Sequence, residues 1–190
     1  CIMLKFGKPT TAVFAHMDSI GFTVRYNNEV VKLGGPRLKS GISLMGEDPE
    51  GLIETKLVVE DAQSQKLKVD LNRPIEPGTN LVFKPKWQQE DKMLTCTYLD
   101  NRLGVWNALK LAETLENGAI CFSCWEETGG GAVGYLGRFL YEKYGVHQAL
   151  ISDITWVTEG VEAGKGVAVS MRDSGIPRRQ YIKKIRAMAE

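Results

Sequence analysis

The stretch that most constrains the fold runs from Gly118 to Gly134, where an apolar run leads into two adjacent carboxylates and then into a glycine-rich turn. Residues 118–124 are mostly apolar and lack helical spacing, a pattern typical of a buried strand. Beyond the turn, apolar side chains recur at helical spacing and predict a helix with one buried face. These side chains are Ala132, Tyr135, Leu136 and Phe139. We therefore expect strand, acidic turn and helix in succession, with Glu126 and Glu127 at the end of the strand.

Two kinds of site compete for this turn. Gly129, Gly131 and Gly134 fit the glycine pattern of dinucleotide-binding proteins, and Asp153 follows at about the spacing of 20 residues that this pattern requires. In such proteins a helix N-terminus faces a pyrophosphate, which the two carboxylates would repel. Paired carboxylates at a strand end favour a divalent cation, with one binding the metal and the other moving protons. A nucleotide-binding oxidoreductase is therefore the least favoured alternative, and the glycines are interpreted as a tight turn.

Length and composition exclude several classes of protein. The 190 residues suit one domain, or one domain that carries a small insert. The net charge of +1 gives no electrostatic basis for binding nucleic acid or an anionic membrane. The sequence has neither an apolar run of about 18 residues nor a signal peptide, so we expect a cytoplasmic protein. We expect the four cysteines to be reduced and mostly buried, with no metal or redox role for Cys121 and Cys124, which lie inside a predicted strand.

A histidine and an aspartate follow the first apolar run that predicts a strand near the start of the chain. The apolar run Thr11–Ala15 ends at His16, and Asp18 lies two residues further on, before an alternating, half-buried strand from Ile20 to Val24. Such an imidazole can hold a metal ion while the neighbouring carboxylate fixes its tautomer. A single histidine of this kind is more often structural, so the pair alone does not establish a site.

The pattern changes between Asn27 and Asp91. Short β-favouring runs such as Val30–Val31, Leu57–Val59 and Leu81–Phe83 alternate there with glycine- and proline-rich turns. Frequent turns between short strands predict a small β-barrel or sandwich. We expect this segment to be an inserted β subdomain that shapes access to the site or contacts between subunits.

Alternating strands and helices resume after the insert. Met93–Leu99 is predicted to be a strand that ends at Asp100, which could bind a metal or simply cap the following helix. The apolar face of that helix holds Val105, Ala108, Leu109 and Ala112.

Three further elements complete the chain. Ala149–Ser152 predicts a strand that ends at Asp153, and Val167–Ser170 predicts one more strand. The residues from Arg178 onward predict a basic helix with a solvated face rather than a nucleic-acid patch.

Four separate segments thus place an acid or an imidazole at the end of a predicted strand. The residues are His16, Asp100, Glu126, Glu127 and Asp153. In α/β proteins, sites collect outside the carboxyl ends of the strands. A single histidine among carboxylates suits a cation such as zinc, cobalt or manganese, and a pair of metals would need a bridging carboxylate.

The same residues lie in four ordered motifs. They are Ala15–Phe22, Leu99–Gly104, Glu126–Gly129 and Ser152–Thr155. In these motifs the chain resembles the deblocking, or tetrahedral, aminopeptidases, a family of co-catalytic metallopeptidases that includes glutamyl aminopeptidases and proteins once labelled cellulases. The resemblance implies an α/β fold in which a catalytic α/β/α domain of the zinc-peptidase type, residues 1–26 and 92–190, is interrupted by a β-barrel insert, residues 27–91.

The resemblance also implies how two divalent metal ions would be held. Asp100 would bridge the two ions, His16 and Asp153 would complete one site, and Glu127 would supply the other. Zinc or cobalt is expected, with manganese as the alternative. The peptide bond after Asp100 would be cis.

The resemblance assigns the proton chemistry to Glu126. This residue would deprotonate a metal-bridging water and return the proton to the leaving amine. Asp18 would orient the imidazole of His16 without itself binding a metal ion.

Some features depart from the family pattern. Both ends of the chain look truncated, and the histidine that closes the family's second metal site near the C-terminus is absent. His147, the only other histidine, does not match the motif and is interpreted as structural. Gly130 and Gly131 replace a bulkier pair, which affects the flexibility of the turn.

The sequence therefore predicts a dinuclear-metal aminopeptidase that hydrolyses N-terminal residues from short peptides. One alternative is a metal-dependent deacylase or amidohydrolase acting on small N-acyl substrates. Another is a non-catalytic fragment that lacks the final histidine ligand. The resemblance implies self-association into a homo-oligomer such as a dodecamer, with no nucleic-acid or membrane partner.

Overall fold

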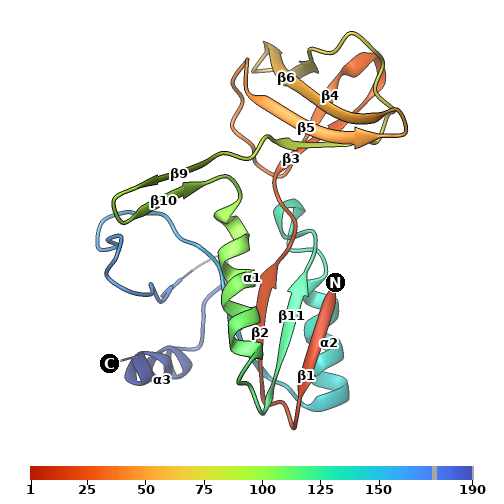
Figure 1. Ribbon diagram of the computed structural model, residues 1–190. Helices are drawn as coiled ribbons and strands as arrows, with labels where there is room; N and C mark the ends of the chain where they lie inside the picture. The colour runs from red at the N-terminus through yellow and green to blue at the C-terminus, as the bar shows by residue number, and fades with distance from the viewer. Residues whose placement is uncertain (173–174, 190) are drawn as a thin grey trace. The chain divides into compact units, whose positions relative to one another are not determined.

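The computed structural model describes residues 1–172 and 175–189 (Figure 1). The chain divides into two compact units, residues 1–154 and 155–190. The first unit contains a four-stranded sheet, a six-stranded sheet and a two-stranded hairpin. All the predicted site residues belong to this first unit.

The four-stranded sheet carries the predicted acidic turn. Its strands are β1 (Ile2–Phe6), β2 (Thr11–His16), β11 (Gly118–Ser123) and β12 (Gln148–Ile151). Their order in the sheet is β1–β11–β2–β12. β11 and β12 both run parallel to β2, whereas β1 is antiparallel to β11. The strands predicted before His16, the acidic pair and Asp153 are therefore confirmed as neighbours in one sheet.

Two helices pack against opposite faces of this sheet (Figure 1), α1 (Leu99–Ala112) and α2 (Val133–Tyr144). Because side chains alternate along a strand, β2 contributes to both faces. Its Phe14 packs in one core cluster with Leu140 of α2, and its Ala15 packs in another with Ala108 of α1. The result is the α/β/α layering that the sequence resemblance implied.

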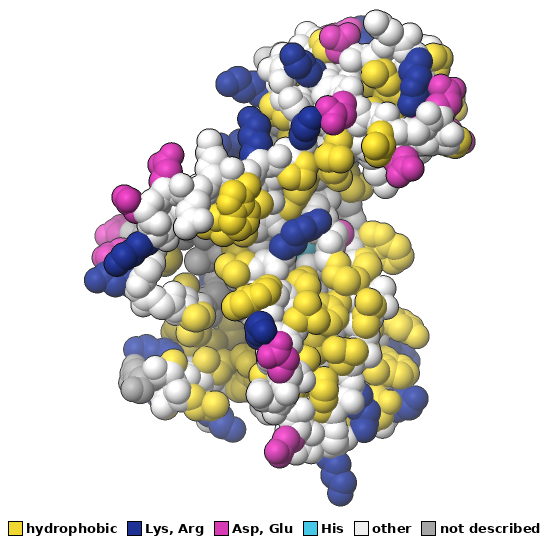
Figure 2. All heavy atoms as spheres, viewed as in Figure 1, with side chains coloured by type: hydrophobic (Ala, Val, Ile, Leu, Met, Phe, Trp, Pro, Cys, Tyr) yellow, Lys and Arg dark blue, Asp and Glu magenta, His cyan; other side chains and the backbone are white. Residues whose placement is uncertain are grey.

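Two helix positions predicted to be buried are exposed. Leu109 of α1 is 50% exposed, and Tyr135 of α2 is 72% exposed. The buried face of α1 instead runs through Asn101, Gly104 and Ala108. The prediction for Leu109 failed because α1 is also apolar on its outer side, where Figure 2 shows exposed apolar side chains. In α2, both Tyr135 and Tyr141 are exposed. Helical spacing alone does not tell which of two apolar faces packs on the sheet.

The six-stranded sheet is antiparallel throughout and nearly closes into a barrel. Its strands are β3 (Gly21–Val24), β4 (Val30–Leu33), β5 (Ser43–Asp48), β6 (Gly51–Asp61), β7 (Lys66–Val69) and β8 (Asn80–Phe83). They are ordered β4–β3–β8–β5–β6–β7, and an isolated bridge between Glu29 and Lys68 links the two edges. A short 3-10 helix, η1 (Tyr26–Asn28), joins β3 to β4. The predicted small barrel is confirmed, and it includes β3, which precedes the segment 27–91.

One predicted strand forms a local hairpin instead of entering the main sheet. β10 (Met93–Cys96) pairs antiparallel with β9 (Trp87–Glu90), which directly precedes it. Asp91, in the turn between them, has a left-handed φ of 48°. The tight turn brings β9 alongside β10 at once, so Asp100 does not lie at the end of a strand of the four-stranded sheet.

The second unit is mostly irregular up to its terminal helix. The prediction of a strand at Val167–Ser170 is wrong, since these residues have no regular structure and Val167 is 95% exposed. The nearby Gly164 and Gly166 have positive φ values, which interrupt an extended strand. The predicted basic helix is present as α3 (Arg179–Ala189). No helix in the described ranges is long and apolar enough to cross a membrane.

Candidate metal centre

Three of the four acid- or imidazole-bearing segments meet at one edge of the four-stranded sheet. His16 is the last residue of β2, and Asp153 lies just beyond β12. Glu126 and Glu127 begin a short 3-10 helix, η2 (Glu126–Thr128), just beyond β11. Because β2, β11 and β12 are parallel, their carboxyl ends coincide at the same edge. The predicted convergence of these residues is therefore present in the structure.

Asp100 also lies beside His16, but it belongs to the start of α1 and not to the end of a strand in the four-stranded sheet. It lies at the start of α1, where Asp100 and Asn101 have non-helical φ and ψ values and the peptide bond between them is cis. The side chain of Asn101 accepts a hydrogen bond from the N–H of Gly104, so Asn101 rather than Asp100 caps the regular part of the helix. Its Oδ1 lies 3.0 Å from Nε2 of His16. A kinked segment at the start of α1, rather than the end of a strand, carries this carboxylate.

His16 is the centre of the cluster. Its Nε2 lies 3.8 Å from Oδ1 of Asp153 and 4.0 Å from Oε2 of Glu126. The histidine is 4% exposed, whereas the side chains of Asp100 and Glu126 are 51% and 45% exposed. The imidazole is thus held in the protein, while the carboxylates around it remain accessible to a ligand.

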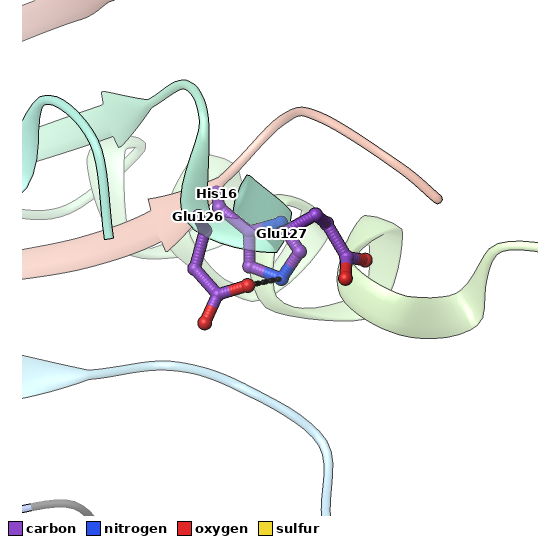
Figure 3. A group of neighbouring side chains, drawn as sticks. All are labelled: His16, Glu126 and Glu127. Carbon is purple, nitrogen blue, oxygen red and sulfur yellow. Dashed lines mark ion pairs between the residues drawn. The ribbon is translucent and has the colours of Figure 1, made fainter. Parts of the chain in front are cut away.

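Two overlapping sets of side chains could hold a metal ion. One set is His16, Glu126 and Glu127, shown in Figure 3, and the other is His16, Asp100 and Asp153. Within each set, one ligand atom per residue lies within 4.8 Å of the others. The second set is the one that the family resemblance assigns to a single metal.

Asp18 connects the histidine to the acidic turn. Its carboxylate oxygens accept hydrogen bonds from the main-chain N–H groups of Glu126, at 3.2 Å, and Glu127, at 3.1 Å. The same carboxylate lies 3.6 Å from Nδ1 of His16. The nearest hydrogen-bond partner of Nδ1 is the main-chain oxygen of Asp18, at 3.2 Å. Asp18 therefore holds the backbone of the acidic turn as well as lying behind the imidazole, a role that the sequence pattern did not indicate.

The net effect of burial and of the neighbouring carboxylates is to raise three pKa values at this site. Burial opposes protonation of His16, but the surrounding Asp153, Glu126, Asp100 and Asp18 carboxylates outweigh it and raise the pKa of His16. Burial, reinforced by neighbouring carboxylates and partly opposed by His16, raises the pKa of Glu126 and also of Glu127. Each group would retain a proton more readily than in water, as expected where negative charges converge.

The donor set fits a divalent cation. Within the described residues, no Lys or Arg side chain pairs with Asp100, Glu126 or Glu127. A metal ion would supply the positive charge that offsets the repulsion among these carboxylates. One imidazole nitrogen and several carboxylate oxygens are ligands of zinc and related ions.

The glycine-rich turn has a steric explanation that needs no nucleotide. Gly129, Gly130 and Gly131 all have positive φ values. A Cβ atom on Gly131 would collide with the Cβ of Trp125 and with the main-chain oxygen of Cys124. The glycines therefore fold the turn closely over the end of β11, as predicted.

Two residues near the site were not singled out from the sequence. Asn101 is 1% exposed and hydrogen-bonds the main chain of two other segments. The hydroxyl of Tyr98 donates to the main-chain oxygen of Ile20 at 3.2 Å and accepts from the N–H of Phe83 at 2.5 Å. Asn101 belongs to the motif Leu99–Gly104 that contains Asp100, so that motif could have drawn attention to it, whereas Tyr98 lies just before the motif.

The fold is shared with solved aminopeptidase structures. The structure of aminopeptidase APDkam598 from the archaeon Desulfurococcus kamchatkensis matches with a TM-score of 0.77 and 20% identity, over 98% of this chain and 63% of that one. The dodecameric PhTET1-12s matches with a TM-score of 0.74 and 21% identity, over 98% and 66% of the two chains. The chain thus spans slightly less than two thirds of the length of these two proteins.

A third similar structure is of a peptidase that forms large assemblies. The Pyrococcus horikoshii TET1 peptidase, described as able to form a tetrahedron or a large octahedral shell, matches with a TM-score of 0.72 and 21% identity, over 98% of this chain and 67% of that one. No curated protein matches the sequence.

The family comparison covers three of the four motifs, those from Leu99 onward. Residues 46–190 match the M42 glutamyl aminopeptidase family, which covers most of the six-stranded sheet and everything that follows. The resemblance inferred from the four motifs is thereby confirmed. The chain belongs to the M42 glutamyl aminopeptidase family.

Proposed function

We propose that this chain carries the active centre of a metal-dependent aminopeptidase that removes N-terminal residues from short peptides. The observation that carries the proposal is the cluster of carboxylates around the buried His16, at the carboxyl edge of the sheet. Membership of the M42 family supports this reaction class.

The ligands divide between two ions. His16, Asp100 and Asp153 would hold one ion, and Glu127 would hold the second together with Asp100. A bound divalent ion would supply Lewis-acid polarisation of the substrate carbonyl. The combination of an imidazole with carboxylates favours zinc or cobalt, with manganese as the alternative.

Glu126 is the proposed general base. Its carboxylate lies close to Nε2 of His16 and is partly exposed, so an attacking water can reach it. Glu126 would take a proton from that water and return it to the leaving amine. Asp18 would hold the main chain of Glu126 and Glu127 while this proton moves.

We also propose that the protein forms a homo-oligomer in the cytoplasm. Similar structures include a dodecamer and a peptidase that assembles into a tetrahedron or an octahedral shell, which supports a homo-oligomer here. All four cysteines are unpaired, which suits the reducing cytoplasm.

The test combines metal content with peptidase activity, for the unmodified chain and for Glu126→Gln, after saturation with zinc or cobalt. We expect Glu126→Gln to retain metal but to lose activity about 10²–10⁴-fold, the usual contribution of a general base. The matched control is Glu142→Gln, because Glu142 is an exposed residue of α2 whose ion pair with Arg138 lies on the same helix.

Each other outcome has a defined meaning. Absence of bound metal in the unmodified chain would reject the metallopeptidase. Activity on N-acylated amino acids but not on peptides with free N-termini would favour an amidohydrolase instead.

A further inference from the structure

Asn101 joins two segments that carry candidate metal ligands. It follows Asp100 directly, and only 1% of it is exposed. Its Nδ2 donates to the main-chain oxygen of Ser152 at 2.8 Å, and its Oδ1 accepts from the N–H of Gly104 at 3.0 Å. A buried amide with both donor and acceptor engaged fixes the groups it binds, because losing either bond would leave a buried polar group unsatisfied. Asn101 therefore ties the first turn of α1 to the end of β12.

A further hydrogen bond connects Ser152 to β2. The N–H of Ser152 donates to the main-chain oxygen of Phe14 at 2.8 Å. Ser152 directly precedes Asp153, and Phe14 lies two residues before His16. One continuous series of contacts thus links residues that lie one or two positions from each member of the His16, Asp100 and Asp153 set.

Gly104 gives independent steric evidence for this contact. A Cβ atom at this position would collide with Oδ1 of Asn101 and with the main-chain oxygen of Ser152. The absence of a side chain allows the backbone of α1 to approach β12 this closely. The approach therefore depends on both the amide and the glycine.

We propose that Asn101 is a positioning residue that sets the separation of Asp100 and Asp153, and thereby the metal affinity of the His16, Asp100 and Asp153 set. The inference rests on the proposed function, since it concerns the same metal centre. It assigns Asn101 no contact with metal or substrate. Residues that orient metal ligands from behind typically change affinity or activity about 10–100-fold when they are replaced.

The test measures zinc affinity by competition with a chelator, in the absence of peptide, for the full chain and for Asn101→Ala. Gly104→Ala is the second variant, because it disturbs the same contacts without changing the amide. Both variants should bind one zinc ion about 10–100-fold more weakly than the unmodified chain. The visible spectrum of the cobalt-loaded variants should also change, since it reports the ligand geometry.

The matched control is Asn28→Ala. Asn28 lies in the barrel, donates to the main-chain oxygens of Leu71 and Arg73, and accepts from the N–H of Ile75. Its replacement should lower the stability of the fold and leave zinc affinity unchanged.

Three results would overturn the inference. Zinc affinities of Asn101→Ala and Gly104→Ala equal to that of Asn28→Ala would show that the contact does not set the ligand spacing. Failure of both variants to fold, with Asn28→Ala folded, would assign Asn101 to the fold rather than to the metal centre. An unmodified chain that binds no zinc would reject the proposed function itself, and this inference with it.

Discussion

At the residue scale, Asp18 does more than contact His16, because its carboxylate also holds the main chain of the acidic turn. Both of its carboxylate oxygens are used by the main chain of the acidic turn, at 3.2 and 3.1 Å. An amide in the same place could accept only one of these hydrogen bonds, because its nitrogen is a donor. The turn would then lose one of its two attachments to the segment that follows β2.

We therefore predict that Asp18→Asn lowers peptidase kcat/KM about 10–100-fold, the usual effect of removing a group that orients catalytic ligands. The control is Asp61→Asn, because Asp61 accepts from the main chain of Gln63 and from the hydroxyl of Ser64 in the barrel. Steady-state kinetics of the metal-loaded variants would decide. Equal losses in both variants would point to a general effect on folding.

Asp48 of β5 lies almost completely buried in the barrel. Its two oxygens accept hydrogen bonds from the guanidinium of Arg73 at 2.6 and 2.8 Å. These hydrogen bonds hold the pKa of Asp48 below its usual value. Since the pKa is lower in the folded protein than in the unfolded chain, ionised Asp48 stabilises the fold at neutral pH. That stabilisation should be lost as the pH falls from about 4 through the folded-state pKa.

Asp48→Asn should thus lower the free energy of unfolding at pH 7, and its difference from the unmodified chain should shrink in acid. Urea unfolding followed by circular dichroism at several pH values measures both quantities. Glu54→Gln is the control, because Glu54 and Lys84 form an exposed pair whose removal should have little effect. A difference for Asp48→Asn that does not depend on pH would contradict the assignment to charge.

At the scale of elements, the barrel strands are held by one inward-facing set of side chains. In β6, Ile53 and Leu57 are buried, whereas Leu52 is 78% exposed, as expected from the alternation of side chains along a strand. Leu44 of β5 is fully buried in the same core cluster as Ile53 and Leu57.

Leu44→Ala should therefore lower the free energy of unfolding by about 2–5 kcal/mol, because it removes buried methyl groups and leaves a cavity. Leu52→Ala makes the same chemical change on the outer face and should stay within about 0.5 kcal/mol of the unmodified chain. Urea unfolding of the two variants tests the assignment of faces. Similar losses for the two variants would mean that the inner face has been assigned wrongly.

At the scale of the whole molecule, we propose that the chain consists of a discontinuous catalytic part and a barrel that folds by itself. Among the described residues, the buried core cluster of the barrel runs from Phe22 to Leu81 and lies within the barrel strands and their connections. The predicted insert, residues 27–91, omits β3, although β3 pairs with both β4 and β8 in the sheet. Without β3 the sheet would be open between those two strands.

We predict that residues 20–85, expressed alone, form a folded β domain with cooperative unfolding, and that residues 27–91 do not. Circular dichroism and the dispersion of amide signals in NMR spectra would distinguish them. Domains of this size are only marginally stable, so the loss of a central strand should be decisive. Equal folding of both segments would move the boundary back to residue 27.

The sequence predicted the parts of the site that depend on local pattern. The buried strand before Glu126, the turn that follows and the helix after it could all be inferred from short-range spacing. The strands that end at His16 and near Asp153 could be inferred in the same way. Local spacing failed for Tyr135 and Leu109, because it does not identify the face of a helix that packs on the sheet.

What the sequence by itself determined is the set of chemical groups and the family that their order indicates. The tertiary structure decided how those groups meet. Asp100 arrives from a helix after a local hairpin, Asp18 holds the acidic turn across 108 and 109 residues of chain, and Asn101 reaches Ser152 across 51 residues. Contacts at such separations depend on strand register and on the close approach of backbones, which no local pattern of residues encodes.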